Sequence, residues 1–226
     1  MDNFDFLKTI RDSFYVYLKT GSRSNEKLKV LHGAIASDFA EKLDSSYVVK
    51  SLGFGPGKED VIQGRYVNKV VDIVISKNNE VLAGIGVKFI MSNYLQNSNN
   101  YFENMLGETA NIRTNGIAYY QILILPEILP YFERAGIIKK WEHITKHNLE
   151  KYIVLSNDDT NVYLHTPTKT LLYLIKFPKT NFINNRKDWI NYYLSNCSFD
   201  INCCEKFDGF GRSLILNDYE SFKNKV

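Results

Sequence analysis

Two charged residues interrupt apolar segments of the sequence and are the first candidates for chemistry. Asp72 lies inside the run 69–76 (KVVDIVIS), and Lys88 lies near the end of the run 81–90 (VLAGIGVKFI). A charged side chain within an apolar strand costs several kcal/mol unless it is paired or binds a metal ion. We therefore expect the two side chains to face each other, either as a buried ion pair or as part of a site that binds a cation.

The segments that carry these residues are predicted to form a hairpin followed by a crossover. Residues 69–76 and 81–90 have the composition of two strands, and 77–80 (KNNE) has that of the turn between them. A polar stretch at 92–100 then leads into a predicted helix at about 100–115. A buried strand is expected at 117–125, because that run (IAYYQILIL) is almost wholly apolar.

The order of these elements resembles the nuclease core of type II restriction endonucleases of the PD-(D/E)XK class, whose signature is an aspartate, a hairpin and then (Asp/Glu)-x-Lys. The segment 98–107 (SNNYFENMLG) is similar to the Asn-Asn…Glu-Glu-Ala-x-Gly segment that follows the catalytic lysine in XhoI-type enzymes. The resemblance implies that Asp72, Lys88 and Glu103 are catalytic, with Mg²⁺ as the cofactor and no small-molecule cofactor. It also implies double-stranded DNA as the substrate and a homodimer as the assembly.

One position departs from the family's signature. Gly86 stands two residues before Lys88, where the signature has a carboxylate. Hard cations such as Mg²⁺ take several oxygen ligands, so one aspartate would hold the ion poorly. We expect Glu103, on the helix that follows, to supply the missing carboxylate, with Glu108 as the second choice; alternatively, Glu103 is an ordinary solvated helix residue.

The implied metal site consists of Asp72, Glu103 and the backbone carbonyl of Val87. Asp38, on the helix before the sheet, is a further candidate, and it too could be an ordinary solvated residue. In the implied mechanism the ion positions a water molecule and offsets charge on the scissile phosphate. Lys88 would orient or help to deprotonate that water and stabilise the developing negative charge.

Residues that could read DNA gather beside the proposed site. Amide and hydroxyl side chains are frequent in the polar stretch, which includes Asn93, Gln96, Asn97, Ser98, Asn99 and Asn100. Asn and Gln can bond bidentately to adenine in the major groove, which favours an A:T-rich target. Phosphate contacts are expected from Lys58, Arg65 and Arg113. Alternatively, these are ordinary polar residues of a loop and a surface.

The remaining segments complete a single domain over residues 1–226, with a core at about 26–156 and a C-terminal elaboration at about 157–226. Its predicted helices cover 3–19, 26–44, 131–150 and 185–195. Its further predicted strands cover 47–52, 151–156, 161–165 and 170–177, and a glycine-rich loop occupies 53–58. The fold class expected is α/β, with the PD-(D/E)XK core as a central mixed sheet flanked by helices, and added elements for dimerisation and DNA contact.

Composition and motifs narrow the function further. The formal net charge is only +3, from 28 basic and 25 acidic residues, which excludes a histone-like polycation. Cys197, Cys203 and Cys204 have no zinc-pair spacing and are interpreted as free thiols of a soluble, cytoplasmic protein. There is no membrane-spanning apolar run, so no membrane partner is expected. The glycine-rich loop has Glu59 where a nucleotide-binding P-loop requires Ser or Thr.

Three functions remain open from the sequence. The first is an endonuclease that cuts both strands of a short palindrome as a homodimer. The second is a sequence-specific DNA-binding protein on a nuclease fold without catalysis, for which Gly86 is the main support. The third is a structure-selective nuclease of repair or recombination.

Overall fold

A mixed β-sheet of seven strands forms the centre of the computed structural model, which describes residues 1–178, 183–196, 200–204 and 207–226. The strand order is β1-β4-β5-β6-β9-β10, and β11 also pairs with β9. The strands are β1 (Tyr47–Ser51), β4 (Ile73–Lys77), β5 (Glu80–Phe89), β6 (Ala118–Pro126), β9 (Lys169–Lys176), β10 (Asn202–Cys203) and β11 (Leu214–Leu216). The prediction of an α/β protein with a central mixed sheet is confirmed.

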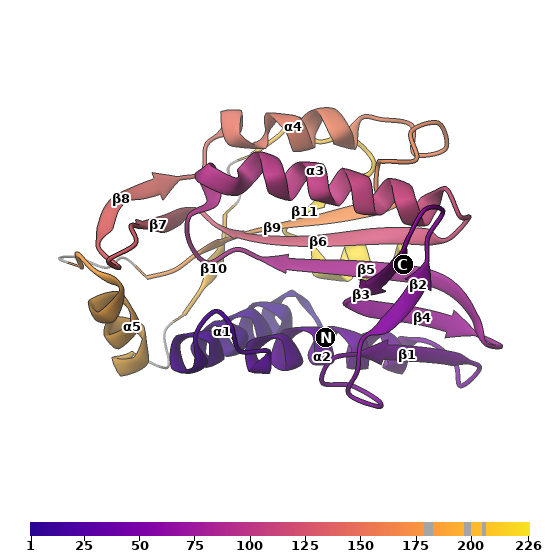
Figure 1. Cartoon of the computed structure of the whole chain (residues 1–226), viewed down its shortest axis with the longest axis horizontal. Helices are drawn as coiled ribbons and strands as arrows, with labels where there is room; N and C mark the ends of the chain where they lie inside the picture. The colour runs from indigo at the N-terminus through magenta and orange to yellow at the C-terminus, as the bar shows by residue number, and fades with distance from the viewer. Residues whose placement is uncertain (179–182, 197–199, 205–206) are drawn as a thin grey trace.

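Helices cover both faces of this sheet (Figure 1). The two parallel connections run from β5 to β6 through α3 (Tyr94–Arg113), and from β6 to β9 through α4 (Lys146–Ser156). The helices α1 (Asn3–Thr20) and α2 (Glu26–Lys42) lie against the opposite face. Side chains alternate along a strand, so β6 sends Ile122 and Ile124 to the α1–α2 side and Leu123 and Leu125 to the α3–α4 side.

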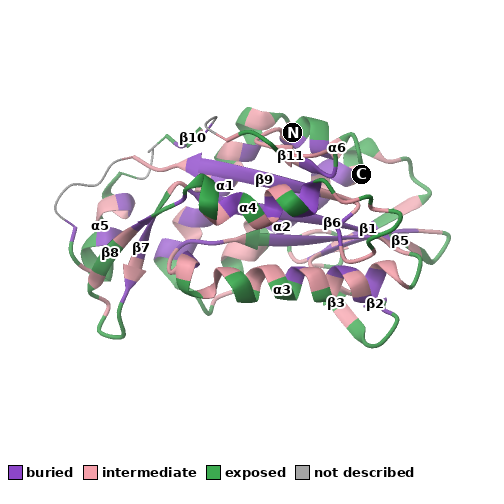
Figure 2. Cartoon of the chain, turned by 90° about the horizontal axis from the view of Figure 1, so that it is seen from above, coloured by how far each residue is buried: buried purple, intermediate pink, exposed green. Residues whose placement is uncertain are grey.

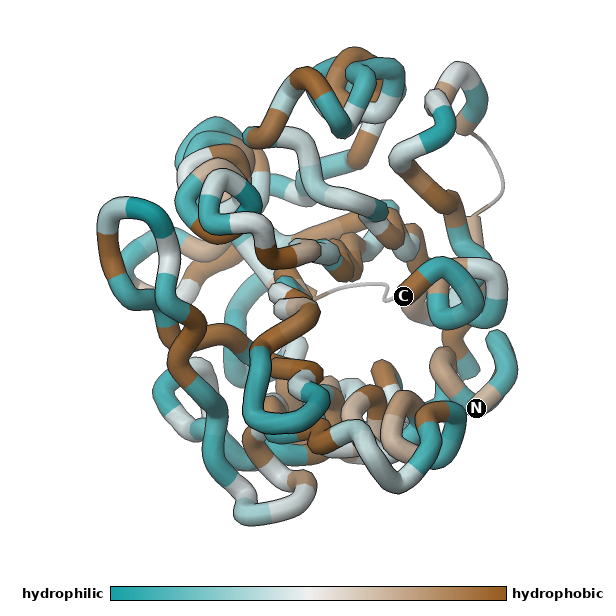
Figure 3. The backbone as a smooth tube through the Cα atoms, turned by 90° about the vertical axis from the view of Figure 1, so that its right-hand side faces the viewer, coloured by the Kyte–Doolittle hydropathy of each residue, from teal (hydrophilic) through white to brown (hydrophobic). Residues whose placement is uncertain are grey.

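Burial on both faces explains the long apolar runs of the central strands. β6 and β9 are almost completely buried, whereas the helices show an exposed stripe on their outer sides (Figure 2). Hydrophilic segments (teal) predominate in the outer turns of the backbone trace, and hydrophobic segments (brown) are frequent nearer its middle (Figure 3). Parallel strands that are covered on two sides require this composition, because neither face meets water. The sheet extends past residue 156, since β9 pairs with β6.

Two small antiparallel sheets project from the main one. The first consists of β2 (Asp60–Gln63) and β3 (Asn68–Val71), and the second of β7 (Ile128–Phe132) and β8 (Ile138–His143). Two further helices, α5 (Arg186–Ser195) and α6 (Tyr219–Lys223), complete the described elements. None of the described helices is long and apolar enough to cross a membrane.

The predicted strand 69–76 is wrong in one respect, because it breaks at Asp72. Residues before the break pair with β2, and residues after it pair with β1 and β5. The Ser51 hydroxyl donates a hydrogen bond of 2.7 Å to the Asp72 carbonyl, and the Asp72 side chain accepts one from the backbone of β5. These bonds satisfy polar groups that a continuous ladder would otherwise pair.

The segment 131–165 also differs from the prediction. Residues predicted as one helix at 131–150 form the β7–β8 hairpin and the start of α4, because Gly136 (φ +78°) turns the chain back. The Asn148 side chain accepts a hydrogen bond from the Thr145 N–H and starts α4 there, so 151–156 is helix and not strand. The predicted strand 161–165 consists of turns. The helices expected at 3–19, 26–44 and 185–195 are confirmed.

Of the three cysteines, Cys197 lies outside the described residues. Cys204 is a buried free thiol. Burial, with the Glu127 carboxylate nearby, raises the pKa of Cys204 to about 12. The sulfur of Cys203 lies 3.3 Å from the Tyr173 hydroxyl oxygen.

Asp38 anchors the two ends of the described chain to α2. Its carboxylate is buried and accepts a hydrogen bond of 2.9 Å from the Tyr219 hydroxyl. It also pairs with Lys223, at 3.2 Å, and with the Met1 amino group. The first and last helices accordingly lie close together (Figure 3). These partners account for the carboxylate, and Asp38 is therefore placed in a structural network instead of the predicted metal site.

We expect Asp38→Asn to lower the free energy of unfolding by about 3 kcal/mol, because it leaves the half-buried Lys223 ammonium without its counter-charge. Urea unfolding followed by circular dichroism measures this change. Asp12→Asn, at a half-exposed aspartate paired with Arg11, is the matched control and should cost about 0.5 kcal/mol or less. Equal effects of the two substitutions would contradict the assigned role.

Candidate functional site

A cavity of about 460 Å³ opens between α2, α3 and the C-terminal end of β5. Several helices and strands contribute polar side chains to its wall, which include His32, Lys69, Asp72, Lys88, Glu108 and Gln121. The cavity thus brings together Asp72 and Lys88, the two residues that the sequence singles out. It also contains groups that the sequence analysis did not connect with them.

The open edge of β5 gives the cavity its shape. β4 begins at Ile73, opposite Ile85, so no described strand pairs with Gly86–Phe89 on that side. The Val87 N–H projects from this edge and donates a hydrogen bond of 2.7 Å to Asp72 Oδ2. In an extended strand the N–H and C=O of one residue point to the same side. The Val87 carbonyl therefore faces the side where the Asp72 carboxylate lies.

Asp72 sits where its negative charge is costly. The side chain is 30% exposed, and burial raises the pKa of this carboxyl to about 6, with the Glu108 charge adding to the shift. The Val87 N–H and the charges of Lys88 and Lys69 act in the opposite direction. At neutral pH the group is mostly ionised, and a bound cation would relieve the cost of that charge.

Lys88 reaches the same cavity from the neighbouring strand. Its ammonium lies 4.8 Å from the centre of the Tyr101 ring, in a cation–π contact, and the residue is exposed. Among the ion pairs of the described residues, none joins Lys88 to Asp72. The alternative of a simple buried ion pair is therefore not what the structure shows, and both groups have atoms free to meet a ligand.

The carboxylate that α3 places at the cavity is Glu108, and the preferred candidate Glu103 lies elsewhere. Glu103 is exposed, and its charge acts on Lys151. The buried residues of α3 include Met105, Thr109 and Ile112, and Glu103 is not among them. The helix therefore turns Glu108, and not the expected Glu103, toward the cavity.

Glu108 is already engaged by two neighbours. Its Oε1 accepts a hydrogen bond of 2.6 Å from the Tyr119 hydroxyl, and its Oε2 lies 3.1 Å from Lys69 Nζ. Burial and the Glu108 charge together raise the pKa of Tyr119 well above its usual range, so this hydroxyl remains a donor. Glu108 contributes negative charge to the cavity. None of the described hydrogen bonds joins it to Asp72.

The side chains of Tyr119 and Gln121 occupy the space that a carboxylate at position 86 would need. Gly86 and Gln121 are direct partners in the parallel register of β5 and β6. A Cβ atom at Gly86 would lie 2.8 Å from Gln121 Oε1 and 2.4 Å from the Tyr119 hydroxyl oxygen. The sequence did contain a signal for Gln121, because it is a polar residue within an apolar strand, as Asp72 is.

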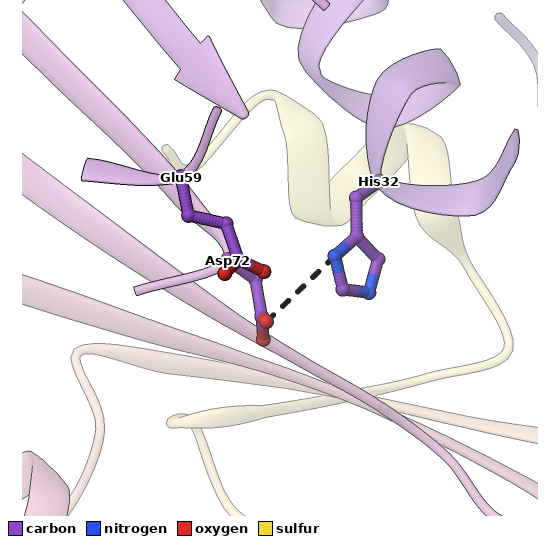
Figure 4. A group of neighbouring side chains, drawn as sticks. All are labelled: His32, Glu59 and Asp72. Carbon is purple, nitrogen blue, oxygen red and sulfur yellow. Dashed lines mark ion pairs between the residues drawn. The ribbon is translucent and has the colours of Figure 1, made fainter. Parts of the chain in front are cut away.

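His32 and Glu59 lie beside Asp72 (Figure 4). His32 is 2% exposed, and its Nδ1 lies 3.7 Å from Asp72 Oδ1 with no hydrogen-bond partner. Ligand atoms of the three residues all lie within 4.8 Å of one another. Burial lowers the pKa of His32 to about 4, against the opposing charge of Glu59, so the imidazole is neutral. Burial and Asp72 raise the pKa of Glu59.

The β2–β3 sheet explains why Glu59 reaches Asp72. Asp60 pairs with Val71 in this sheet, so the residue before β2 and the residue after β3 are neighbours across the strands. His32, on α2, lies on an apolar helix face in the sequence, where a buried histidine has many ordinary explanations. Glu59 follows a glycine-rich loop, and nothing in the sequence alone indicates its partner.

Two of the predicted DNA contacts are used inside the protein. Asn93 accepts a hydrogen bond from the Phe132 N–H and donates one to the Phe132 carbonyl, which ties the start of α3 to β7. The Arg113 guanidinium donates to the carbonyls of Thr160 and Thr166, at 2.7 and 2.6 Å. These bonds satisfy the Asn93 amide and hold the loop after α4, which corrects the prediction that these two side chains face DNA.

The other predicted contacts lie on accessible surface. The polar stretch is not a loop, because α3 begins at Tyr94 and places Gln96, Asn97, Ser98, Asn99 and Asn100 in its first turns. Gln96, Asn99 and Asn100 are exposed, and Lys151 donates to Asn99. Lys58 is exposed on the glycine-rich loop and Arg65 on the turn of the β2–β3 hairpin, and neither lines the cavity. Their contact with DNA stays a prediction.

Comparison of the chain with protein-family models, with curated proteins and with solved structures finds no match. The resemblance to restriction endonucleases therefore depends on the residues and the geometry described above. No relative supplies a role for Asp72, Lys88 or Gln121.

We expect Asp72→Asn to raise stability at pH 8 in EDTA. A folded pKa of about 6 exceeds the unfolded value near 3.9, so the ionised form weakens the fold above pH 6, and this penalty fades below pH 4. The gain should be about 1–2 kcal/mol after allowance for partial exposure. Unfolding curves at pH 8 and pH 4 measure it, and a variant less stable than the wild type at pH 8 would contradict it.

Gly86→Asp would place a carboxylate two residues before Lys88, as in the PD-(D/E)XK signature, but the structure leaves no space for it. The new side chain meets Gln121 and the buried, hydrogen-bonded Tyr119, so we expect a loss of about 1–3 kcal/mol. Thermal unfolding tests this, with Gly107→Asp as the control because a Cβ there meets nothing within 4 Å. A Gly86→Asp protein as stable as the control would show that the space is not filled as described.

Proposed function

We propose that the protein is a metal-dependent endonuclease of the PD-(D/E)XK class that hydrolyses phosphodiester bonds in both strands of a short palindromic DNA site. The observation that carries this proposal is the open edge of β5. The Asp72 carboxylate, the Val87 backbone and the Lys88 side chain all belong to that edge and line one cavity. This is the spatial arrangement that the nuclease signature implies.

The residues at this edge suit a divalent cation. Asp72 would hold it together with the Val87 carbonyl, and Glu59 and His32 lie close enough to add ligands. The bound ion, which the family resemblance identifies as Mg²⁺, would offset negative charge on the scissile phosphate. Gln121 offers an amide group at the place where the signature has its second carboxylate.

Lys88 has the chemistry to act on the reacting phosphate. Its ammonium carries three donors and has no carboxylate partner among the described ion pairs, so it can hold the attacking water and bond to a phosphate oxygen. The Tyr101 ring limits where the ammonium can go. A fixed cation beside the scissile bond stabilises the charge that develops there.

Several cations around the cavity suit a polyanionic substrate. Lys27 and Lys69 line it together with Lys88, and Lys58 and Arg65 are exposed elsewhere on the surface. Such side chains position the phosphate backbone, whereas the amide-rich first turns of α3 would read an A:T-rich sequence. Two copies related by a two-fold axis would present two such sites to a palindrome, so the proposal includes a homodimer.

Lys88→Met is expected to reduce DNA cleavage by about 100-fold or more, because it removes the cation that acts on the phosphate. The assay incubates A:T-rich plasmid and phage DNA with the purified protein in Mg²⁺ or in EDTA and separates the fragments. Lys77→Met is the matched control. That lysine also lies over a tyrosine ring, at 4.3 Å from its centre, but it is at the end of β4 that is farther from Asp72.

Discrete fragments that require both the cation and Lys88 support the endonuclease. A second candidate, a DNA-binding protein without catalysis, is favoured by Gly86 and by the engagement of Glu108 with Lys69. Tight binding to DNA that stays intact with every divalent cation would select it. Preferential cutting of branched junctions over linear duplexes would instead select a structure-selective nuclease.

A further inference from the structure

The buried imidazole of His32 lacks a partner that its position demands. Its Nδ1 is inaccessible, accepts no hydrogen bond in the structure and faces Asp72 Oδ1 at 3.7 Å, which is beyond hydrogen-bonding distance (Figure 4). A buried polar atom without a partner is destabilising, because it has lost its hydrogen bonds to water and gained none within the protein. Two carboxylates stand in front of this nitrogen, and no lysine or arginine pairs with either of them among the described ion pairs.

We propose that His32, Glu59 and Asp72 form a three-ligand site, with one imidazole nitrogen and two carboxylates, for a first-row transition-metal cation of the Mn²⁺ type. The spacing of the ligand atoms, all within 4.8 Å of one another, lets one ion reach all three. This inference deepens the proposed function and rests on it only for what the ion does during hydrolysis. The binding of the ion is a separate property that can be measured without DNA.

The ligand set decides which ion the site prefers. Mg²⁺ takes oxygen ligands and keeps much of its water shell, so an imidazole adds little to its binding. Mn²⁺ binds carboxylates as readily as Mg²⁺ does, and it also binds imidazole nitrogen. The group of His32, Glu59 and Asp72 contains no cysteine, whose sulfur would favour a softer ion. The site should therefore favour Mn²⁺ over Mg²⁺ by more than an all-oxygen site would, and the excess should depend on His32.

Backbone contacts hold the elements that carry these ligands. A Cβ at Gly33 would lie 2.8 Å from the Gly53 carbonyl oxygen, and one at Gly53 would lie 2.3 Å from the Lys29 carbonyl oxygen. The glycine-rich loop thus packs directly on α2 beside His32, and it leads to Glu59. The β2–β3 register then places Glu59 next to Asp72. The three ligands are positioned before any ion arrives, which favours binding.

The test measures metal binding to the full-length protein after EDTA treatment and desalting, without DNA. Mn²⁺ is titrated and the free ion is followed by electron paramagnetic resonance, and Mg²⁺ competition gives the second affinity. We expect a single Mn²⁺ per chain in the wild type. His32→Gln should weaken Mn²⁺ binding by about tenfold or more while Mg²⁺ binding changes much less. Glu59→Gln should weaken the binding of both ions.

His147→Gln is the matched control, because that histidine also lies beside a glutamate, with Nδ1 3.0 Å from Glu150 Oε2, but is exposed on α4. Its Mn²⁺ affinity should equal that of the wild type. Wild-type affinity and ion preference in His32→Gln would overturn the site. If His32→Gln does not fold, Glu59→Gln provides the test, because this half-buried loop side chain can be replaced without loss of the fold. Undiminished Mn²⁺ affinity in Glu59→Gln would overturn the site equally.

The failures of the two proposals are distinguishable. Mn²⁺ binding that depends on His32 and Glu59, with DNA left intact, would remove the nuclease and keep the metal site. Cleavage that requires Lys88, with Mn²⁺ binding indifferent to His32 and Glu59, would keep the nuclease and remove the three-ligand site.

Discussion

The hydrogen bond from the Val87 N–H to Asp72 is the interaction on which the arrangement of the site depends. It places a carboxylate where a neighbouring strand would otherwise continue the ladder. The pairing of β4 with β5 therefore does not extend beyond Ile73 and Ile85, and the edge of β5 at Gly86–Phe89 stays open. The chain before Asp72 is free to join β2 in a separate small sheet. A single side-chain acceptor thus replaces a strand, and the space that the strand would fill becomes the cavity.

This arrangement keeps negative charges in a place where burial disfavours them. Asp72 keeps its carboxylate near Glu59 and Glu108, and burial disfavours the negative charges of Asp72 and Glu59. A protein optimised for stability alone would replace such groups with apolar ones of similar volume. Perturbed carboxylates that converge in a cleft are instead typical of functional sites, where an ion or a substrate supplies the missing positive charge.

Much of the fold could be predicted because its patterns are local. The apolar runs of β5, β6 and β9 and the helical spacing in α1 and α2 gave correct elements, and the misplaced Asp72 and Lys88 were recognised as unusual from their neighbours alone. The β7–β8 hairpin was missed because its residues also fit a helical period, and only the turn at Gly136 and the Asn148 cap decide between the two.

The site was harder to predict because its partners meet through tertiary contacts. The rotation of α3, which selects Glu108 over Glu103, is determined by which residues pack on β5 and β6. The neighbours of Asp72 come from α2 and from a loop, and neither separation in the sequence indicates contact. Asn93 and Arg113 show the converse case, in which polar residues typical of a binding surface serve the backbone of their own chain.

The β2–β3 hairpin has a consequence for how this protein can change over evolutionary time. Glu59 immediately precedes β2 and Asp72 immediately follows β3, and the pairing of Asp60 with Val71 keeps them adjacent. Because side chains alternate along a strand, a shift of one residue in this register would turn one of these two side chains away from the other. A single insertion within either strand would separate Glu59 from Asp72. The tip of the hairpin is held as well, because the backbone N–H groups of Tyr66 and Val67 donate hydrogen bonds to Asn111 Oδ1 on α3. Both the phase of the two strands and the length of the tip are therefore constrained.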